Sequence, residues 1–250
     1  MRRKGQHFLV DASVISRMAD YADLCSADRV LEIGPGTGNL TGMLAHRAGW
    51  VYAVEVDPAL ADDLEGKFGN VEVIRGDALK VELPRFNKIV SNLPYQISSQ
   101  ITYRFLKTPF DLAVLMYQKE FAQRMLALPR EEMYGRLGMA VGCLCRAEIL
   151  ERVPRSAWRP VPQVDSAIVR LRPRDMDVNA GMLMSFVEGL FRQRRKKTRN
   201  ALAAMGFSSE ALQTLDAALL ERRPEELSPE EAAHILGTLD PGSRRESSSM

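Results

Sequence analysis

The chain has 250 residues, of which 46% are hydrophobic and 26% charged, and its formal net charge is +2. These values are typical of a soluble globular protein with one full-sized domain and a smaller one. No apolar run approaches the roughly 20 residues of a membrane span, and no secretion signal or zinc-like cysteine spacing is found, so we expect a cytoplasmic protein without membrane or metal.

From Arg29 onward, short β-rich runs alternate with helical stretches, which predicts βαβ units and a parallel sheet. The predicted strands are Arg29–Ile33, Trp50–Glu55, Val71–Arg75, Lys88–Ser91 and Leu112–Tyr117. The predicted helices are approximately Gly38–Arg47, Ala59–Phe68, Ser98–Leu106, Glu120–Leu128 and Leu137–Cys145. Two further strand-like runs, Glu148–Val153 and Ser166–Leu171, are expected to close the sheet as a hairpin at one edge.

The strand pattern ends in a polar stretch at about Arg174–Gly181, which we interpret as a domain boundary. Everything after it is helical in pattern, and capped helix starts are expected at Ser209–Leu212 and at Ser228–Glu231. The expected domains are therefore 1–174 and 175–240. A disordered tail is expected at 241–250.

A glycine-rich turn, Glu32–Gly38, follows the first predicted strand and opens a helix. Glycines permit a sharp turn and close approach to a ligand, but the spacing is GxGxG and no Walker lysine follows, so phosphate cradling is not expected. Glu55 ends the next predicted strand, at the place where an acid typically binds ribose hydroxyls. Asp77 follows the third predicted strand and could accept a hydrogen bond from an adenine amino group. Together they favour a nucleoside site over a simple tight turn.

The stretch Asn92-Leu93-Pro94-Tyr95 follows another apolar run, and Pro94 predicts a turn at the carboxyl end of that strand. Ligands of open α/β sheets bind at this end. The Asn92 carboxamide and a backbone carbonyl could both accept hydrogen bonds from one exocyclic amine. Tyr95 offers a flat face on which a base could stack. An ordinary turn is the alternative.

Six cations crowd into one acid-free stretch after the boundary. They are Arg192, Arg194, Arg195, Lys196, Lys197 and Arg199. A basic helix here could follow RNA phosphates, although some of these side chains should simply be solvated.

Seven segments together resemble the ribosomal RNA adenine N6-dimethyltransferase family, over about Gly5 to Leu239. They are Gly5–Leu9, Glu32–Gly38, Val54–Asp57, Gly76–Ala78, Asn92–Tyr95, Pro160–Ser166 and Arg194–Leu202. The resemblance implies a Rossmann-like, S-adenosylmethionine-dependent α/β methyltransferase sheet of seven strands, with the last pair antiparallel. It also implies a small all-helical C-terminal domain that binds RNA.

The resemblance also implies roles for individual residues. His7 and Leu9 would lie beside the methionine end of S-adenosylmethionine, although a lone His7 would otherwise be read as exposed and uninvolved. Gly34 and Gly36 would line the cofactor, Glu55 would hold its ribose and Asp77 its adenine. Asn92 would contact both the cofactor and the substrate amine.

The implied chemistry is methyl transfer to N6 of an unstacked adenosine, with Asn92, Leu93, Pro94 and Tyr95 as the catalytic turn. Tyr95 would stack on one face of the base. Trp158, where the family has Phe, would cover the other face unless it is a domain-interface packing residue. Gln163 replaces a usual lysine, which removes a phosphate contact.

The function expected from the resemblance is dimethylation of two adjacent adenosines near the 3′ end of 16S-type ribosomal RNA during small-subunit assembly. The expected partner is the small ribosomal subunit precursor, and the enzyme is expected to be a monomer. Two alternatives stay open: a large-subunit methylase of the macrolide-resistance type, and a catalytically idle RNA- or DNA-binding factor on the same fold.

Overall fold

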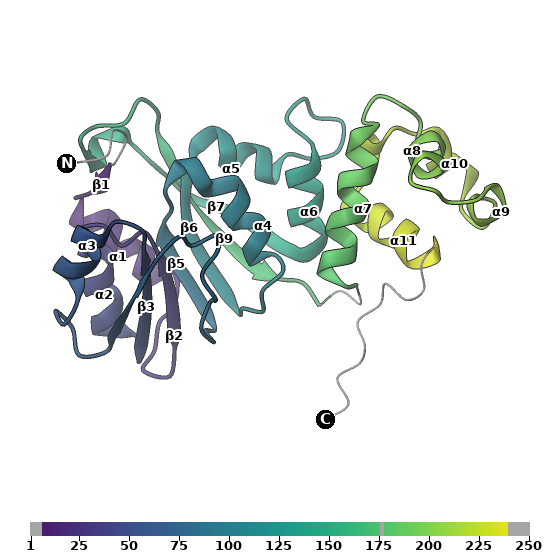
Figure 1. Ribbon diagram of the computed structural model, residues 1–250. Helices are drawn as coiled ribbons and strands as arrows, with labels where there is room; N and C mark the ends of the chain where they lie inside the picture. Colours follow the sequence, from purple (N-terminus) through teal and green to yellow (C-terminus); the bar gives the residue numbers. More distant parts are fainter. Residues whose placement is uncertain (1–6, 176–177, 240–250) are drawn as a thin grey trace. The chain divides into compact units, whose positions relative to one another are not determined.

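The structure is a computed structural model that describes residues 7–175 and 178–239, and it divides into two compact units (Figure 1). The first unit contains the described residues up to Ala122 together with Glu148–Pro173. The second contains Gln123–Ala147 and the described residues from Arg174 onward. The sequence analysis places Gln123–Ala147 in the first domain, and its two-domain division stays a prediction. The tail expected at 241–250 lies outside the described residues.

A seven-stranded, mostly parallel sheet is the centre of the first unit. Its spatial order is β4 (Val71–Arg75), β3 (Trp50–Glu55), β2 (Arg29–Ile33), β5 (Lys88–Asn92), β6 (Leu112–Gln118), β9 (Ser166–Pro173) and β7 (Cys145–Val153). The strands from β4 to β6 pair in parallel, and β9 pairs antiparallel to β6. The predicted fold class, a Rossmann-like sheet with a helical C-terminal part, is confirmed.

Both faces of the central strands β2, β3, β5 and β6 are buried, as expected for parallel strands made of apolar runs. Val30, Val51 and Val90 pack with two helices, α1 (Ala12–Tyr21) and α2 (Asn39–Arg47), in one hydrophobic cluster. On β6, the Tyr117 hydroxyl lies 2.8 Å from Thr102 Oγ1 of α4 (Ser98–Phe105).

Several element boundaries differ from the predictions. The helix expected at Ala59–Phe68 is shorter, α3 (Pro58–Leu64), because Gly66 takes a left-handed φ of +71° that stops it. The helix expected to reach Cys145 ends at Leu144, since β7 starts directly after it. Helix α1, with Asp11 as its N-cap, was not predicted, nor was the short ribbon of β1 (Phe8–Leu9) and β8 (Trp158–Arg159).

The second unit is helical. Its elements are α6 (Arg136–Leu144), α7 (Ala180–Arg192), α8 (Thr198–Ala204), α9 (Ser209–Leu212), α10 (Ala217–Glu221) and α11 (Pro229–Leu239), and α5 (Lys119–Leu126) leads into it. Both expected capped starts are confirmed. Ser208 caps α9, and Ser228 exchanges hydrogen bonds with Glu231 at the start of α11.

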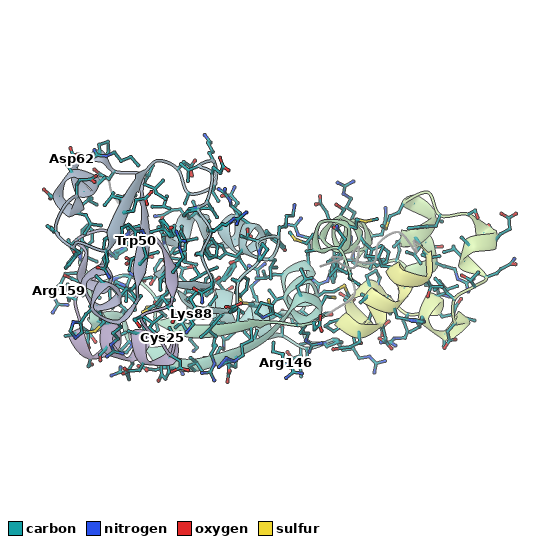
Figure 2. The ribbon with its side chains drawn as sticks, turned by 90° about the horizontal axis from the view of Figure 1, so that it is seen from below. Cys25, Trp50, Asp62, Lys88, Arg146 and Arg159 are labelled. Atoms are coloured by element: carbon teal, nitrogen blue, oxygen red, sulfur yellow. The ribbon has the colours of Figure 1, made fainter. Side chains whose placement is uncertain are left out.

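A polar cluster closes the amino-terminal edge of the central strands. Lys88 Nζ lies 2.9 Å from Asp28 Oδ2, and this carboxylate also accepts from the Cys25 amide at 2.7 Å. Burial opposes ionisation of Asp28, but hydrogen bonds from Asn87, Lys88 and Cys25 outweigh it and lower its pKa. Figure 2 shows Cys25 and Lys88 near one another at this edge. Among the described residues, no helix is long and apolar enough to cross a membrane.

Candidate active site

A cavity of about 500 Å³ opens at the carboxyl ends of β2, β3, β4 and β5. All residues predicted for catalysis, cofactor binding and base stacking line it, although they come from distant parts of the sequence. These residues are His7, Leu9, Gly34, Gly36, Glu55, Asp77, Asn92, Leu93, Pro94, Tyr95 and Trp158. The six predicted RNA-binding cations lie elsewhere, in the second unit.

The glycine-rich turn forms one wall of the cavity and requires glycine for two reasons. Gly34 and Gly36 have φ values of +67° and +58°, a region that side chains rarely adopt. A Cβ at Gly34 would also lie 2.9 Å from Pro94 Cγ, and one at Gly36 would lie 3.0 Å from the Phe8 ring. The turn therefore packs directly against both the predicted catalytic turn and the amino-terminal strand.

Two of the predicted carboxylates are already engaged by backbone amides. Glu55 Oε2 accepts from the Gly36 amide at 3.2 Å, and Oε1 accepts from the Asp57 amide at 2.9 Å. Asp77 Oδ1 accepts from the Leu79 amide at 2.9 Å. Each oxygen can accept a second hydrogen bond, so both side chains are fixed in place and can still accept from a ligand.

Glu32 is a third acid in the cavity, and the sequence analysis noted it without assigning it to the site. Its side chain is only 2% exposed, and its Oε2 has no hydrogen-bond partner among residues 7–175 and 178–239. Burial raises the pKa of Glu32 to about 8, and the neighbouring Glu55 carboxylate acts in the same direction. A buried, unpaired acid that lines a cavity is suited to a cationic ligand.

The raised pKa of Glu32 predicts a pH dependence of stability that Glu32→Gln should remove. Because the folded state binds this proton more tightly than the unfolded state, the free energy of unfolding should fall as pH rises from about 4.5 to about 8. The slope from this group approaches about 1.4 kcal/mol per pH unit. Urea unfolding at pH 5.5 and 7.5 should show this fall in the wild-type protein and a smaller one in Glu32→Gln. An identical fall in both proteins would contradict the assignment of this pH dependence to Glu32.

The predicted catalytic turn is anchored to the sheet on both sides. Asn92 is the last residue of β5, one residue longer than the predicted strand, and a 3-10 helix follows at Tyr95–Ile97. Before it, the Ser91 hydroxyl donates to the Ile33 carbonyl at 2.7 Å, which ties β5 to the strand that carries the glycine-rich turn. After it, the Tyr95 hydroxyl lies 2.6 Å from Ser166 Oγ.

The acceptors of this turn differ in availability. The Pro94 carbonyl accepts from the Ile97 amide at 3.2 Å and from the Ser98 hydroxyl at 3.4 Å. Within the described part of the chain, the Asn92 carboxamide and the Leu93 carbonyl have no hydrogen-bond partner. These two groups, rather than the Pro94 carbonyl, are therefore available to a ligand amine.

The ribbon of β1 and β8 brings the amino-terminal segment to the cavity. Phe8 pairs with Arg159 and Leu9 with Trp158, while Asn39 Nδ2 donates to the Leu9 carbonyl at 2.9 Å. The His7 Nδ1 atom lies 2.8 Å from the Pro160 carbonyl oxygen. His7 is partly exposed and lines the cavity, so its role beside the cofactor stays a prediction. Gly5 and Gln6 of the same motif lie outside the described residues.

Trp158 lines the cavity but is only 1% exposed. Its ring belongs to a hydrophobic cluster whose residues all lie in the first unit. A stacking role for Trp158 stays a prediction, and it requires the ring to become exposed when a base enters.

The six-cation stretch is not a helix, so this part of the prediction is wrong. Arg192 ends α7, residues 193–197 form a turn, and Arg199 belongs to α8. The stretch itself lacks acids, but the fold supplies them: Glu188 pairs with Arg192, Glu225 with Arg194, and Glu221 with both Lys197 and Arg199. In the described chain, Arg195 and Lys196 are exposed and without an ion pair, and they stay candidates for RNA contact.

No group of three or more metal-ligating side chains exists among residues 7–175 and 178–239.

A family model described as "Ribosomal RNA adenine dimethylase" matches residues 1–236. The probable ribosomal RNA small subunit methyltransferase A of Methanosarcina barkeri is 46% identical over 92% of this chain and 84% of its own length. The protein with this description from Pyrococcus furiosus is 43% identical over 92% and 89%.

Two solved structures are similar over nearly the whole chain. A dimethyladenosine transferase from Plasmodium falciparum has a TM-score of 0.82 and 28% identity, covering 95% of this chain and 98% of that one. The 23S rRNA methyltransferase ErmE has a TM-score of 0.69 and 33% identity, covering 93% and 99%.

Proposed function

Because the chain belongs to the ribosomal RNA adenine dimethylase family, we propose that it dimethylates N6 of two adjacent adenosines near the 3′ end of small-subunit ribosomal RNA, with S-adenosylmethionine as methyl donor. The observation that carries this proposal is the single cavity in which a glycine-rich nucleoside turn meets the Asn92–Tyr95 turn. Such a cavity can hold a cofactor and a base side by side.

The residues present fit S-adenosylmethionine. When bound, this cofactor supplies a methyl group activated by the adjacent positive sulfur. Gly34 and Gly36 line the cavity with backbone alone, Glu55 can accept hydrogen bonds from ribose hydroxyls, and Asp77 can accept one from the adenine amine. The unpaired Oε2 of Glu32 suits a ligand that carries positive charge. His7 and Leu9 cover the cavity from the amino-terminal strand.

The catalytic turn acts by holding the target amine. The Asn92 side-chain oxygen and the Leu93 carbonyl accept its two hydrogens, which directs the nitrogen lone pair toward the donor. Pro94 fixes the turn, and Tyr95 stacks on the base. No strong base is needed because the proton can leave after the methyl group arrives. Orienting two reactants in this way can remove about 7–11 kcal/mol of the barrier.

The small-subunit substrate is favoured by the comparisons. The relatives described as small-subunit enzymes are 43% and 46% identical, whereas the large-subunit enzyme ErmE is 33% identical. A role in assembly of the small subunit and a cytoplasmic location follow from this substrate. A catalytically idle factor is not supported, since both turns are intact and meet in one cavity.

The proposed function is tested by methyl transfer from labelled S-adenosylmethionine to unmodified small and large ribosomal subunits. Dimethyladenosine mapped to adjacent positions near the 3′ end of the small-subunit RNA is the expected result. Label found only in large-subunit RNA would assign the macrolide-resistance activity instead. RNA binding without any label would contradict the enzymatic role.

Arg195 and Lys196 are proposed to contact RNA phosphates, so reversing both charges should weaken RNA binding. The double variant Arg195→Glu/Lys196→Glu should lower the slope of log affinity against log salt by about two, one per phosphate contact. Lys67→Glu/Lys107→Glu is a control with the same change of net charge at two exposed lysines of the first unit. Filter binding over a salt series measures both. If the slope is unchanged in the first variant, Arg195 and Lys196 do not contact RNA phosphates.

A further inference from the structure

The hydroxyl of Tyr95 is not explained by base stacking, because a phenylalanine ring would offer the same flat face. In the structure this hydroxyl lies 2.6 Å from Ser166 Oγ, a hydrogen-bond distance. Ser166 is 71 residues further along the chain and is fully buried. The two residues join the turn after β5 to the first residue of β9.

Ser166 is well placed to act as a fixed point. Its backbone pairs with Gln118 in the antiparallel ladder between β6 and β9, so its position is set by the sheet. Within the described residues, Tyr95 provides the one hydrogen-bond partner of the Ser166 hydroxyl. A buried serine that only filled space could be alanine, since an unpaired buried hydroxyl is unfavourable.

The bond restrains the ring at the end far from the backbone. Tyr95 is held at its backbone by the 3-10 turn after Pro94, but its first side-chain torsion could still place the far end of the ring at more than one position. Because the hydroxyl lies on the long axis of the ring, holding it fixes where that axis points, while the ring still lines the cavity. The ring is therefore held at one position beside the cavity before any base arrives, which lowers the entropy cost of placing the base in reactive geometry.

We propose that Ser166 is a positioning residue for methyl transfer, which holds the Tyr95 ring at the position that receives the target adenine. The inference rests on the proposed function, since it requires an adenine in this cavity. Ser166 touches neither cofactor nor base in this role, and its effect passes through the Tyr95 hydroxyl.

The first test compares Ser166→Ala with Ser166→Thr, which keeps the hydroxyl. With small-subunit RNA and cofactor both saturating, Ser166→Ala should lower the single-turnover rate of methyl transfer by about tenfold. Ser166→Thr should recover most of it. Affinity for S-adenosylhomocysteine, measured by calorimetry, should stay unchanged in both. A Ser166→Ala rate equal to that of the wild type would overturn the proposal.

The second test asks whether the effect passes through Tyr95. Tyr95→Phe breaks the same bond from the other side, so adding Ser166→Ala to it should lower the rate by less than about twofold. Tyr21→Phe is a matched control, because it removes a hydroxyl that donates to Glu151 away from the cavity. It should leave the rate unchanged. A full additional loss in the Tyr95→Phe background would mean that Ser166 acts through packing alone.

A spectroscopic readout separates positioning from general damage. An RNA fragment with 2-aminopurine at the target position should be quenched when its base stacks on Tyr95, and less so with Ser166→Ala. Equal quenching in both proteins would overturn the proposal. Failure of the wild-type protein to methylate RNA would instead overturn the proposed function, and this outcome is recognised without any variant.

Discussion

Replacing Asn92 by alanine should lower methyl transfer by at least about a thousandfold while RNA affinity changes by less than about twofold. The carboxamide is the side-chain acceptor proposed for the target amine, and no hydrogen bond within the described chain occupies it. Its loss removes the acceptor that orients the target amine but no cationic contact to RNA. Single-turnover transfer from labelled cofactor and filter binding of the same RNA measure the two quantities.

Asn92→Asp provides the matched comparison. Aspartate has nearly the same shape and keeps an acceptor oxygen, so it should retain more activity than alanine, although its charge alters the cavity. Equal losses of RNA affinity and of transfer in Asn92→Ala would contradict the role assigned to the carboxamide.

Gly34→Ala should abolish cofactor binding, with an expected loss of affinity of at least about a hundredfold. An L-residue at a φ of +67° costs about 1–2 kcal/mol, and the new Cβ would lie 2.9 Å from Pro94 Cγ. Relief of this contact must move either the glycine-rich turn or the catalytic turn. Calorimetry with S-adenosylhomocysteine measures the affinity, and methyl transfer should be lost with it.

Gly66→Ala separates the cost of the positive φ from the cost of the contact with Pro94. Gly66 has a similar φ of +71°, but nothing lies within 4 Å of its missing Cβ. It should therefore lose only the backbone contribution to stability, about 1–2 kcal/mol, and keep its cofactor affinity. Cofactor affinity of Gly34→Ala equal to that of Gly66→Ala would show that the contact with Pro94 does not restrict the turn.

The parallel strands could be predicted from the sequence because β2, β3, β5 and β6 are short, mostly apolar runs buried on both faces, while the partly buried β4 is rich in β-branched residues. Strands β2, β3 and β4 begin and end at the predicted residues. Helix α1 was not predicted, although the sequence carries two signals for it. Asp11 is a typical N-cap residue, and the residues after it follow a strongly amphipathic pattern. The two-residue strands β1 and β8 could not be predicted, because their pairing joins residues about 150 positions apart and leaves no periodic signal.

The candidate site was predictable where its residues end strands, since strand ends meet at one edge of a parallel sheet. Glu55, Asp77 and Asn92 are of this kind. The role of Ser166 could not be predicted, because it depends on a contact with Tyr95 that forms only when β9 pairs with β6. The acids that pair with the basic stretch could not be predicted for a similar reason: they are close to it in space but lie outside the stretch in sequence.

The location of Cys25 offers a way to follow this protein optically. Of the three cysteines of the chain, all within the described residues, Cys25 is exposed, whereas burial raises the pKa of Cys143 and Cys145 to about 12. Thiol reagents react with the thiolate, so a maleimide dye at neutral pH should attach to Cys25 alone. Strand β2 separates it from the glycine-rich turn by five residues, roughly 16 Å. A dye there would report RNA binding through its anisotropy without entering the cavity.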